Sequence, residues 1–496
     1  MNILTGNKND KWIIALICIL AAARVFFYSA SFPFFTNLDE QAHLDLVIKY
    51  SSGHYPQSFE KLSTETAYYI PRYESPEYFN VAADQPGGKF QAPSWTKPES
   101  LMQRYYQEGT AYWSNNYVNH ESSQAPLYYF LAGIWMNIGQ LLGITGGYLL
   151  YWIRFLNILF IVSLVVIASE IAKELFPEDA FLSIAVPALV AFIPQDSYYT
   201  IENDVLSPVF FGITFLFLIK YFNSQLRSKP LAIATGISLA ATMLVKTTNL
   251  PLLPVVLISI LVIAIKSRKV NREILLSLSI IFACAIIPMI LWCTRNYQTF
   301  GDLTGSIEKI KILGWTTKAI SDWYPHPIFS ISGMKEFLSG LIATFWRGEL
   351  IWNKSMISNH ALDLFFIISS IIFLSAAVIV KNDNGSSKNK IINRIAIICI
   401  LAMIAYMGIL SISFDFGNCE NPSRAHPYFV SGRLITSVLI PFSVLYLLGM
   451  KFLLRPLKNN IYKLLVLAIV IAWICTSEFN IHESVFKSPY NYFHLN

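Results

Sequence analysis

The sequence predicts an all-α polytopic membrane protein with about 11 transmembrane helices (10–13) and a large first external loop that carries interfacial helices. Hydrophobic residues make up 54% of the 496 residues and charged residues only 14%, and the mean hydropathy is +0.48. The apolar residues come in blocks of roughly 17 to 22, the length that crosses ~30 Å of hydrocarbon. A soluble protein of this size needs more polar surface than this composition provides.

The apolar blocks begin close to the amino terminus. The first block, at 12–32, is too long for a cleavable signal peptide and lacks a small-residue cleavage site, so we expect a retained anchor. The six cysteines contain no CxxC pair and favour neither a disulfide framework nor a zinc site. The expected spans lie at 12–32, 148–169, 180–199, 204–222, 231–247, 250–266, 274–293, 361–380, 391–413, 432–449 and 461–477.

The charges between these spans predict the topology, because cytoplasmic connections are enriched in Lys and Arg. The basic connections hold Arg227 with Lys229; Lys266, Arg268, Lys269 and Arg272; the segment Lys381 to Lys390; and Lys451, Arg455, Lys458 and Lys463. The connections near 200–203, 247–249, 294–360 and 414–431 then face outward. We therefore expect a multi-pass membrane protein with the amino terminus (Lys8, Lys11) inside, and with loop 33–125 and the carboxyl terminus outside.

The segment 126–144 has two interpretations. It is apolar enough to be a twelfth span, but that would place loop 33–125 in the cytoplasm and the basic amino terminus outside. A helix lying in the outer interface avoids this conflict, and Tyr128, Tyr129 and Trp135 suit the headgroup level.

The composition also suggests a division into two parts. We expect a catalytic module at 1–360, including the external loop 33–147, and carboxy-terminal helices at 361–496 with an external loop at 414–431. The polar segment 381–390 reads as a flexible linker near that boundary.

The first candidate site is the motif Asn37-Leu38-Asp39-Glu40-Gln41-Ala42-His43, just beyond the outer end of the first span. Adjacent carboxylates repel one another and are costly to dehydrate at a membrane surface. On a helix that starts near Asp39, His43 lies one turn away on the same face, with Glu40 alongside. The motif could form a base with an orienting partner or half of a metal site. The alternative is that Asn37 or Asp39 only caps a helix.

A second acidic cluster runs from Gln195-Asp196 to Glu202-Asn203-Asp204, on the same predicted side. The alternative is an ordinary polar hairpin between two spans. Two weaker signals on that side are His120, which precedes the interfacial segment, and Arg424 with His426 in the last external loop.

Cations at the outer span ends break the positive-inside pattern. They are Arg154, Lys246, Arg295 and Arg433. Phosphate is their natural ligand, because Arg offers a planar fork of donors and Lys a mobile charge. The alternatives are pairing with nearby acids or snorkelling to headgroups. Arg24, inside the first span, needs a partner in the bundle interior.

The motifs together resemble the C-type (GT-C) superfamily of membrane glycosyltransferases. The likeness is greatest to a bacterial membrane-protein family with a Pro-Asp-Glu-x-x-His motif, and more distant to the protein mannosyltransferases and the lipid A aminoarabinose transferases. The matching segments are LDEQAH (38–43), SQAPLYYFLAG (123–133), WIRFLN (152–157), PQDSYYTIENDVL (194–206), LVKTTNLPLLP (244–254), TRNYQTFGD (294–302) and SGRLITSVLIP (431–441). Asn37-Leu38 replaces the family's proline, and Ala125-Pro126 stands where His-Pro-Pro or Lys-Pro-Pro is common.

The resemblance implies transfer of a sugar from a polyprenyl-phosphate donor to an envelope glycan or lipid, such as lipopolysaccharide. It implies Asp39 as general base, with Glu40 and His43 as neighbours and Asp204 as a second acidic site. Lys246, Arg295 and Arg433 would hold the departing phosphate. Displacement by one base would invert the anomeric centre. A divalent metal ion held by Asp39, His43 and Asp204 stays open. Membrane lipids are expected partners, and nucleic acid is not.

Two other functions stay open at this point. A secondary transporter would explain the spans and buried charges, but the sequence has no internal repeat and has a long first loop. A glycan polymerase or ligase that uses lipid-diphosphate substrates is chemically close, although its largest external loop usually falls late in the chain.

Overall fold

The computed structural model describes residues 9–266, 271–379, 387–419 and 421–493, and this part of the chain is almost entirely helical. The predicted all-α membrane class is confirmed. The α-helices are α1 (Asn9–Ser31), α2 (Glu40–Ser51), α3 (Thr64–Tyr73), α4 (Glu99–Asn116), α5 (Leu127–Leu141), α6 (Gly147–Leu175), α7 (Ala180–Ala191), α8 (Ser207–Asn223), α9 (Lys229–Val245), α10 (Leu252–Lys266), α11 (Arg272–Phe300), α12 (Ser306–Ile312), α13 (Ile331–Arg347), α14 (His360–Ile379), α15 (Ser387–Ser413), α16 (Leu439–Leu453), α17 (Asn460–Ile481) and α18 (Glu483–Phe486).

Short elements connect these helices. Two antiparallel pairs of two-residue strands are β1 (Thr316–Thr317) with β4 (Phe414–Asp415), and β2 (Ile351–Trp352) with β3 (Ser355–Met356). The 3₁₀ segments that matter below lie at Asp196–Tyr199, Asn203–Leu206, Thr247–Asn249 and Gly432–Val438.

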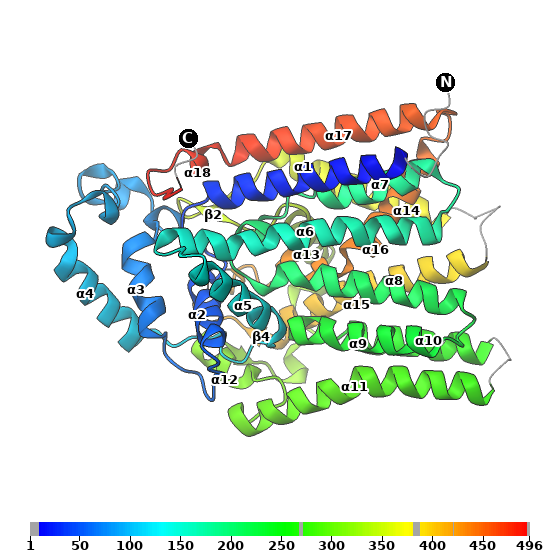
Figure 1. Ribbon diagram of the computed structural model, residues 1–496, viewed down its shortest axis with the longest axis horizontal. Helices are drawn as coiled ribbons and strands as arrows, with labels where there is room; N and C mark the ends of the chain where they lie inside the picture. The colour runs from blue at the N-terminus through cyan, green and yellow to red at the C-terminus, as the bar shows by residue number, and fades with distance from the viewer. Residues whose placement is uncertain (1–8, 267–270, 380–386, 420, 494–496) are drawn as a thin grey trace.

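Long helices lie side by side along one axis and form the membrane body (Figure 1). Nine helices in the described residues are long and apolar enough to cross a membrane, and Ala180–Ala191 and Lys229–Val245 are shorter apolar helices. The predicted span at 180–199 is shorter because α7 ends at Ala191. Pro194 follows closely, and a proline disfavours helical backbone in the residue before it. The count of about eleven stays a prediction.

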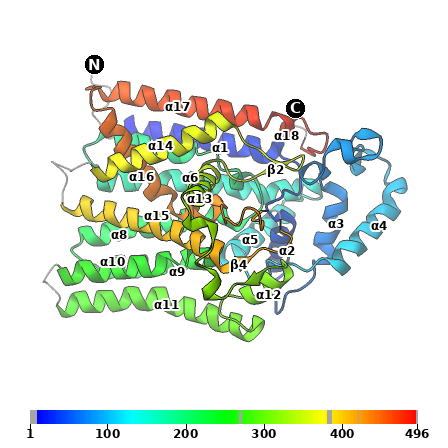
Figure 2. The same cartoon turned by 180° about the vertical axis from the view of Figure 1, so that it is seen from behind.

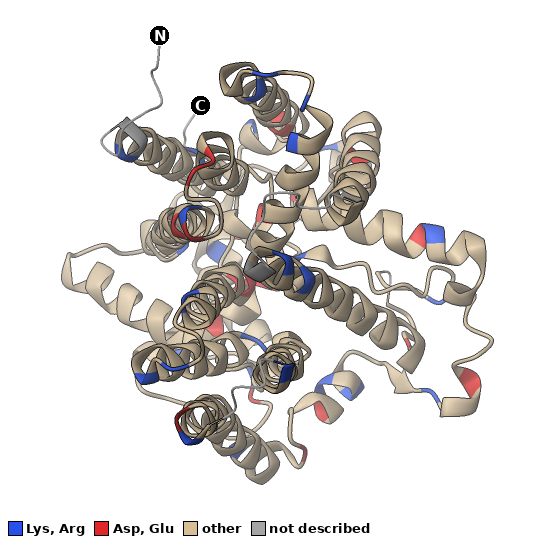
Figure 3. Ribbon diagram, turned by 90° about the vertical axis from the view of Figure 1, so that its right-hand side faces the viewer, with Lys and Arg blue, Asp and Glu red and all other residues tan. Residues whose placement is uncertain are grey.

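The helices alternate in direction as the charge pattern predicts. The connections α6–α7, α8–α9 and α16–α17 lie at the end where α1 begins, and α2, α12 and α18 lie at the opposite end (Figures 1 and 2). Figure 3 looks onto the first of these ends and shows Lys and Arg at several helix ends. Lys8, Arg268, Lys269 and Lys381 fall outside the described residues. Which end faces the cytoplasm stays a prediction.

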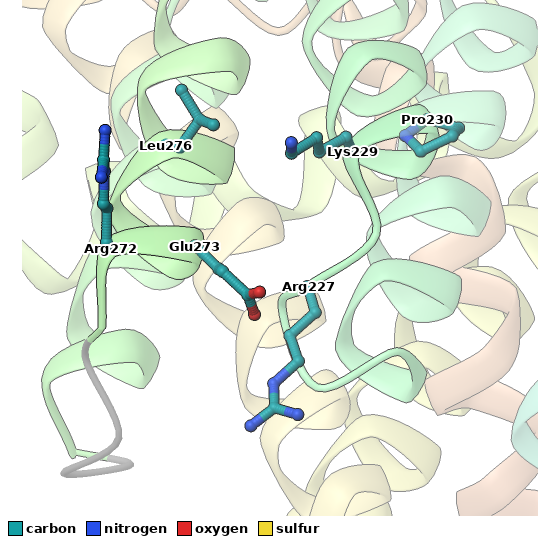
Figure 4. Close-up of a pocket in the computed structure, with 6 residues that line it drawn as sticks. All are labelled: Arg227, Lys229, Pro230, Arg272, Glu273 and Leu276. Carbon is teal, nitrogen blue, oxygen red and sulfur yellow. The ribbon is translucent and has the colours of Figure 1, made fainter.

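The end of the bundle where α1 begins, here called the basic end, also has an open pocket of about 520 Å³. It lies between the α8–α9 turn and the start of α11 (Figure 4). Arg227, Lys229 and Arg272 line it with Glu273. All four residues are exposed, so the pocket fits the expected positive face and lies far from the candidate site.

Helix α5 does not have the length of a span. Its 15 residues extend about 22 Å at ~1.5 Å per residue, which is less than the ~30 Å of hydrocarbon. It packs against α2 and α6 at the end of the bundle opposite the basic end. This geometry favours the interfacial interpretation over a twelfth span.

The carboxy-terminal helices share a core with the rest of the protein. Residues on both sides of position 360 belong to one buried apolar cluster, and α16 packs against α7, α8 and α14. Arg24 on α1 pairs with Glu478 on α17, with Nη2 2.7 Å from Oε1, so its expected partner exists. The division at 360 stays a prediction.

Candidate active site

Asp39 lies at the junction between the extended segment after α1 and the start of α2. Its backbone has φ 59° and ψ 27°, in the left-handed region, and its side chain makes no capping hydrogen bond. The carbonyl of Asp39 instead accepts the amides of Ala42 and His43, at 2.8 and 3.0 Å. Since Asn37 also bonds elsewhere, the interpretation of this motif as a side-chain cap is wrong. The Asp39 side chain is 37% exposed and therefore open to a ligand.

The nearest charged partner of Asp39 is His120, with Nε2 3.5 Å from Oδ1. The same nitrogen lies 3.4 Å from Glu121, and Glu121 accepts from Lys309 on α12 at 2.7 Å. Burial raises the pKa of Asp39, but the charge and hydrogen bond of His120, together with the charge of Arg433, bring the pKa down to about 2. Burial lowers the pKa of His120, and Asp39 and Glu121 more than reverse this, so the pKa is raised. Asp39 is thus ionised at neutral pH, beside an imidazole whose charged form its surroundings favour.

His43 lies on the same face of α2 one turn from Asp39, as the spacing predicts. Its side chain is buried, and Nδ1 lies 2.7 Å from the hydroxyl of Tyr129 on α5. Burial lowers the pKa of His43 to about 4, against the opposing charge of Glu121. The imidazole is therefore neutral and fixed by Tyr129.

Glu40 points away from Asp39 and forms a sealed pair with Arg154 on α6. Two hydrogen bonds of 2.7 Å join the carboxylate to Arg154 Nε and Nη2, and both side chains are 0% exposed. Glu40 also accepts the amides of Thr36 and Ile201, each at 3.0 Å. Arg154 gives its other donors to carbonyls of the segment before Asp39, including Phe32 at 2.6 Å. This geometry supports a role for both residues in holding that segment, and not the expected contact of Arg154 with phosphate.

Asp204, Lys246 and Arg433 come together, although they are far apart in sequence. Lys246 Nζ lies 2.7 Å from Asp204 Oδ2. Arg433 Nη1 lies 2.6 Å from Glu202 and 3.4 Å from Asp204. Burial raises the pKa of Glu202 to about 8, against the opposing charge of Arg433, so Glu202 is largely protonated at neutral pH. Arg433 and Lys246 both contribute to the electrostatic environment of His43.

The third predicted phosphate ligand, Arg295, lies apart from this group. Its Nη2 donates to the carbonyl of Pro56 in the first loop, and the guanidinium lies 5.1 Å from the Trp292 ring centroid and 4.9 Å from that of Phe300. None of its contacts within the described residues is to an acid of the Asp39 or Arg433 groups. Its role in phosphate binding stays a prediction.

The residues of the second acidic cluster have two different sets of partners. Asp196 Oδ2 accepts the amide of Leu350 at 2.6 Å, and Gln195 Nε2 donates to the carbonyls of Thr344 and Phe345. These residues fix the end of α13 and the loop that follows it. Glu202 and Asp204, in contrast, meet the cations described above.

The metal ligands expected from sequence differ from those that the geometry offers. Within the described residues, the one group of at least three possible ligand atoms within 4.8 Å is Asp39, His120 and Glu121. His43 directs Nδ1 to Tyr129, and Asp204 is paired with Lys246, so the expected set of Asp39, His43 and Asp204 is not assembled. Lys309 already neutralises Glu121.

Sequence reasoning missed Glu121, Lys309 and Glu349 and gave little weight to His120. The adjacent His120 and Glu121, just before the interfacial segment, are a signal that could have been weighted more. Glu349 Oε1 lies 2.5 Å from Arg433 Nε. It gave no such signal, because its partner lies 84 residues away.

A sequence profile of the family described as predicted membrane protein (DUF2142) matches residues 18–419. The chain belongs to this family. The DUF2142 match includes the Asp39 motif, His120, Lys246 and Glu349, whereas Arg433 lies beyond it. It confirms the expected membership in a family of multi-span membrane proteins. No curated protein matches the chain.

Three solved structures show a distant likeness to this DUF2142 protein. An oligosaccharyltransferase of Archaeoglobus fulgidus in complex with Zn and sulfate is 11% identical with a TM-score of 0.48, over 95% of this chain and 53% of its own. ArnT from Cupriavidus metallidurans bound to undecaprenyl phosphate is 10% identical with a TM-score of 0.46, over 97% and 74%. The oligosaccharyltransferase AglB from Archaeoglobus fulgidus, with an inhibitory peptide and a dolichol-phosphate, is 11% identical with a TM-score of 0.38, over 97% and 56%. This chain thus spans about half the length of the first structure.

Proposed function

We propose that this protein is a membrane glycosyltransferase that moves a sugar from a polyprenyl-phosphate donor to an envelope glycan or lipid acceptor. The observation that carries the proposal is an ionised, solvent-open carboxylate, Asp39, at the same end of the bundle as the paired cations Lys246 and Arg433. The ordered sequence motifs that resemble C-type glycosyltransferases support the same reaction. We place the site on the outer side of the inner membrane.

The reaction is a direct displacement. The acceptor hydroxyl oxygen forms a bond to the anomeric carbon, the bond from that carbon to the phosphate oxygen breaks, and the hydroxyl proton passes to Asp39. Polyprenyl phosphate leaves with the bonding electrons, and Arg433 and Lys246 stabilise its charge. A single displacement of this kind inverts the anomeric centre.

The low pKa of Asp39, about 2, limits how it acts. A carboxylate this acidic is a weak base but a strong hydrogen-bond acceptor, so its main task is to bind and orient the acceptor hydroxyl. The proton moves late, as the phosphate departs. His120 favours the ionised form of Asp39.

A divalent metal ion could also be held at Asp39, His120 and Glu121, which offer two carboxylates and an imidazole. Such an ion would supply Lewis-acid stabilisation of the phosphate.

The test is transfer of labelled sugar from a panel of polyprenyl-phosphate donors in membranes that contain either the wild type or Asp39→Asn. Asparagine tolerates the left-handed backbone of Asp39, so the variant removes charge without backbone strain. We expect a loss of roughly 10²- to 10⁴-fold at unchanged expression. Glu99→Gln, on the exposed face of α4, is the matched control and should keep full activity. Equal activity in wild type and Asp39→Asn would contradict the role of Asp39, and no transfer from any donor would favour a polymerase or a transporter.

A further inference from the structure

Arg433 is the only predicted phosphate ligand whose guanidinium contacts three different carboxylates within the described residues. Glu202 and Asp204 lie on the buried side, with side chains 0% and 1% exposed. Glu349 lies on the accessible side, because its side chain is 17% exposed and that of Arg433 is 14% exposed. The accessible side of Arg433 is therefore the side on which Glu349 lies.

The charges of this group balance without any ligand. Lys246 neutralises Asp204, and Glu202 is largely protonated because its pKa is about 8. Glu349 then supplies the negative charge that Arg433 requires. The phosphodiester of a polyprenyl-phosphate sugar carries one negative charge. Bound beside Glu349 it would add an uncompensated charge, whereas in place of Glu349 it would preserve the balance.

Glu349 is also attached to a segment that other residues hold firmly. Asn37 accepts the amide of Ile351 at 2.8 Å and donates to the carbonyl of Glu349 at 3.1 Å. Asp196 accepts the amide of Leu350. The backbone of Glu349 is thus fixed beside the Asp39 motif, and only its side chain needs to turn away to uncover Arg433.

We propose that Glu349 is the resident counter-ion of Arg433 and that the phosphate of the polyprenyl carrier binds by replacing its carboxylate. This proposal rests on the proposed function for the identity of the carrier. The exchange keeps Arg433 paired before binding, during transfer and after product release. The affinity for lipid phosphate then depends on competition between the phosphate and the Glu349 carboxylate for Arg433.

The test compares the affinity of purified wild type and Glu349→Gln for undecaprenyl phosphate in detergent. Glutamine keeps an oxygen that accepts from Arg433 Nε but removes the competing charge. We expect the dissociation constant to fall roughly two- to fivefold, as for a partly exposed ion pair. Undecaprenol, which lacks the phosphate, should bind equally to both proteins, because only the head group competes with Glu349.

Asp363→Asn is the matched control. Asp363, on α14, pairs at 2.8 Å with Arg347, two residues before Glu349, and its side chain is 19% exposed. No contact between Asp363 and Arg433 is present within the described residues. Its variant should bind undecaprenyl phosphate as the wild type does. Unchanged or weaker binding in Glu349→Gln overturns the proposal, and so does an equal gain in Asp363→Asn.

A second variant covers the case that Glu349→Gln does not fold. Ser431 donates its hydroxyl hydrogen to Glu349, so Ser431→Ala loosens Glu349 without changing charge. A smaller gain in affinity supports the exchange, and no gain overturns it. Tighter binding without sugar transfer from any donor would support the counter-ion role of Glu349 and contradict the proposed glycosyltransferase function. Sugar transfer by the wild type, with unchanged affinity of Glu349→Gln for undecaprenyl phosphate, would support the glycosyltransferase function and contradict the counter-ion role.

Discussion

Two acid–arginine pairs flank the Asp39 motif, and they differ in access to solvent. Glu40–Arg154 is fully buried. Backbone amides donate further hydrogen bonds to Glu40, and Arg154 donates to backbone carbonyls. Glu349–Arg433 is partly exposed and lies beside two further acids. The first pair fixes the backbone that carries Asp39. The second presents a charge that a ligand can use. The same two residue types thus give a structural element or a binding site, depending on burial.

The largest expected effect breaks the sealed pair. In Arg154→Met, the Glu40 carboxylate stays buried without its cation, which we expect to cost roughly 3–5 kcal/mol of unfolding free energy. Arg433→Met is the comparison. It leaves Glu202 largely neutral and Asp204 paired with Lys246, so stability should fall less while sugar transfer is lost. Thermal unfolding in detergent and the transfer assay measure the two effects. Equal destabilisation of both variants would contradict the distinction.

The next effect concerns Gly348, which begins the segment that carries Glu349. Gly348 has φ +87°, and a Cβ atom there would lie 1.8 Å from Asp196 Oδ1. Gly348→Ala must therefore move the segment or Asp196, and we expect a loss of about 2–4 kcal/mol with a loss of transfer.

Gly53→Ala is the matched control for that variant. Gly53 has a similar φ of +75° but nothing within 4 Å of a Cβ atom. It should show only the backbone cost of a positive φ, about 1 kcal/mol. A similar loss in both glycine variants would show that the Asp196 contact does not position the Glu349 segment.

Much of the membrane body was predictable from sequence, because apolar blocks and basic connections are local signals. The end of α7 was predicted too late, since the helix stops before Pro194 and the chain continues as a 3₁₀ turn. The gathering of Asp204, Lys246 and Arg433 at one end followed from topology alone.

The partners within the site were harder to predict, because they depend on how distant segments meet. His120 lies 81 positions after Asp39 in the printed sequence, and Arg433 meets Glu349 across 84 positions. No local pattern reports such contacts. Arg154 carried the same signal as Arg433, a cation at an outer span end, and only the structure shows that their burial and their partners differ.

The smallest expected effect is a pH dependence that comes from Asp196, which anchors the open pair. Burial, with the nearby charge of Glu349, raises the pKa of Asp196 to about 7. Between the unfolded pKa of about 3.9 and about 7, the folded protein holds a proton that the unfolded chain has lost. The stabilisation from this group is therefore full at the acidic limit and declines as pH rises to about 7. Asp196→Asn keeps an acceptor for the Leu350 amide but cannot titrate, so its unfolding temperature should vary less with pH, by a few degrees. Parallel pH profiles for wild type and Asp196→Asn would rule out this source of the dependence.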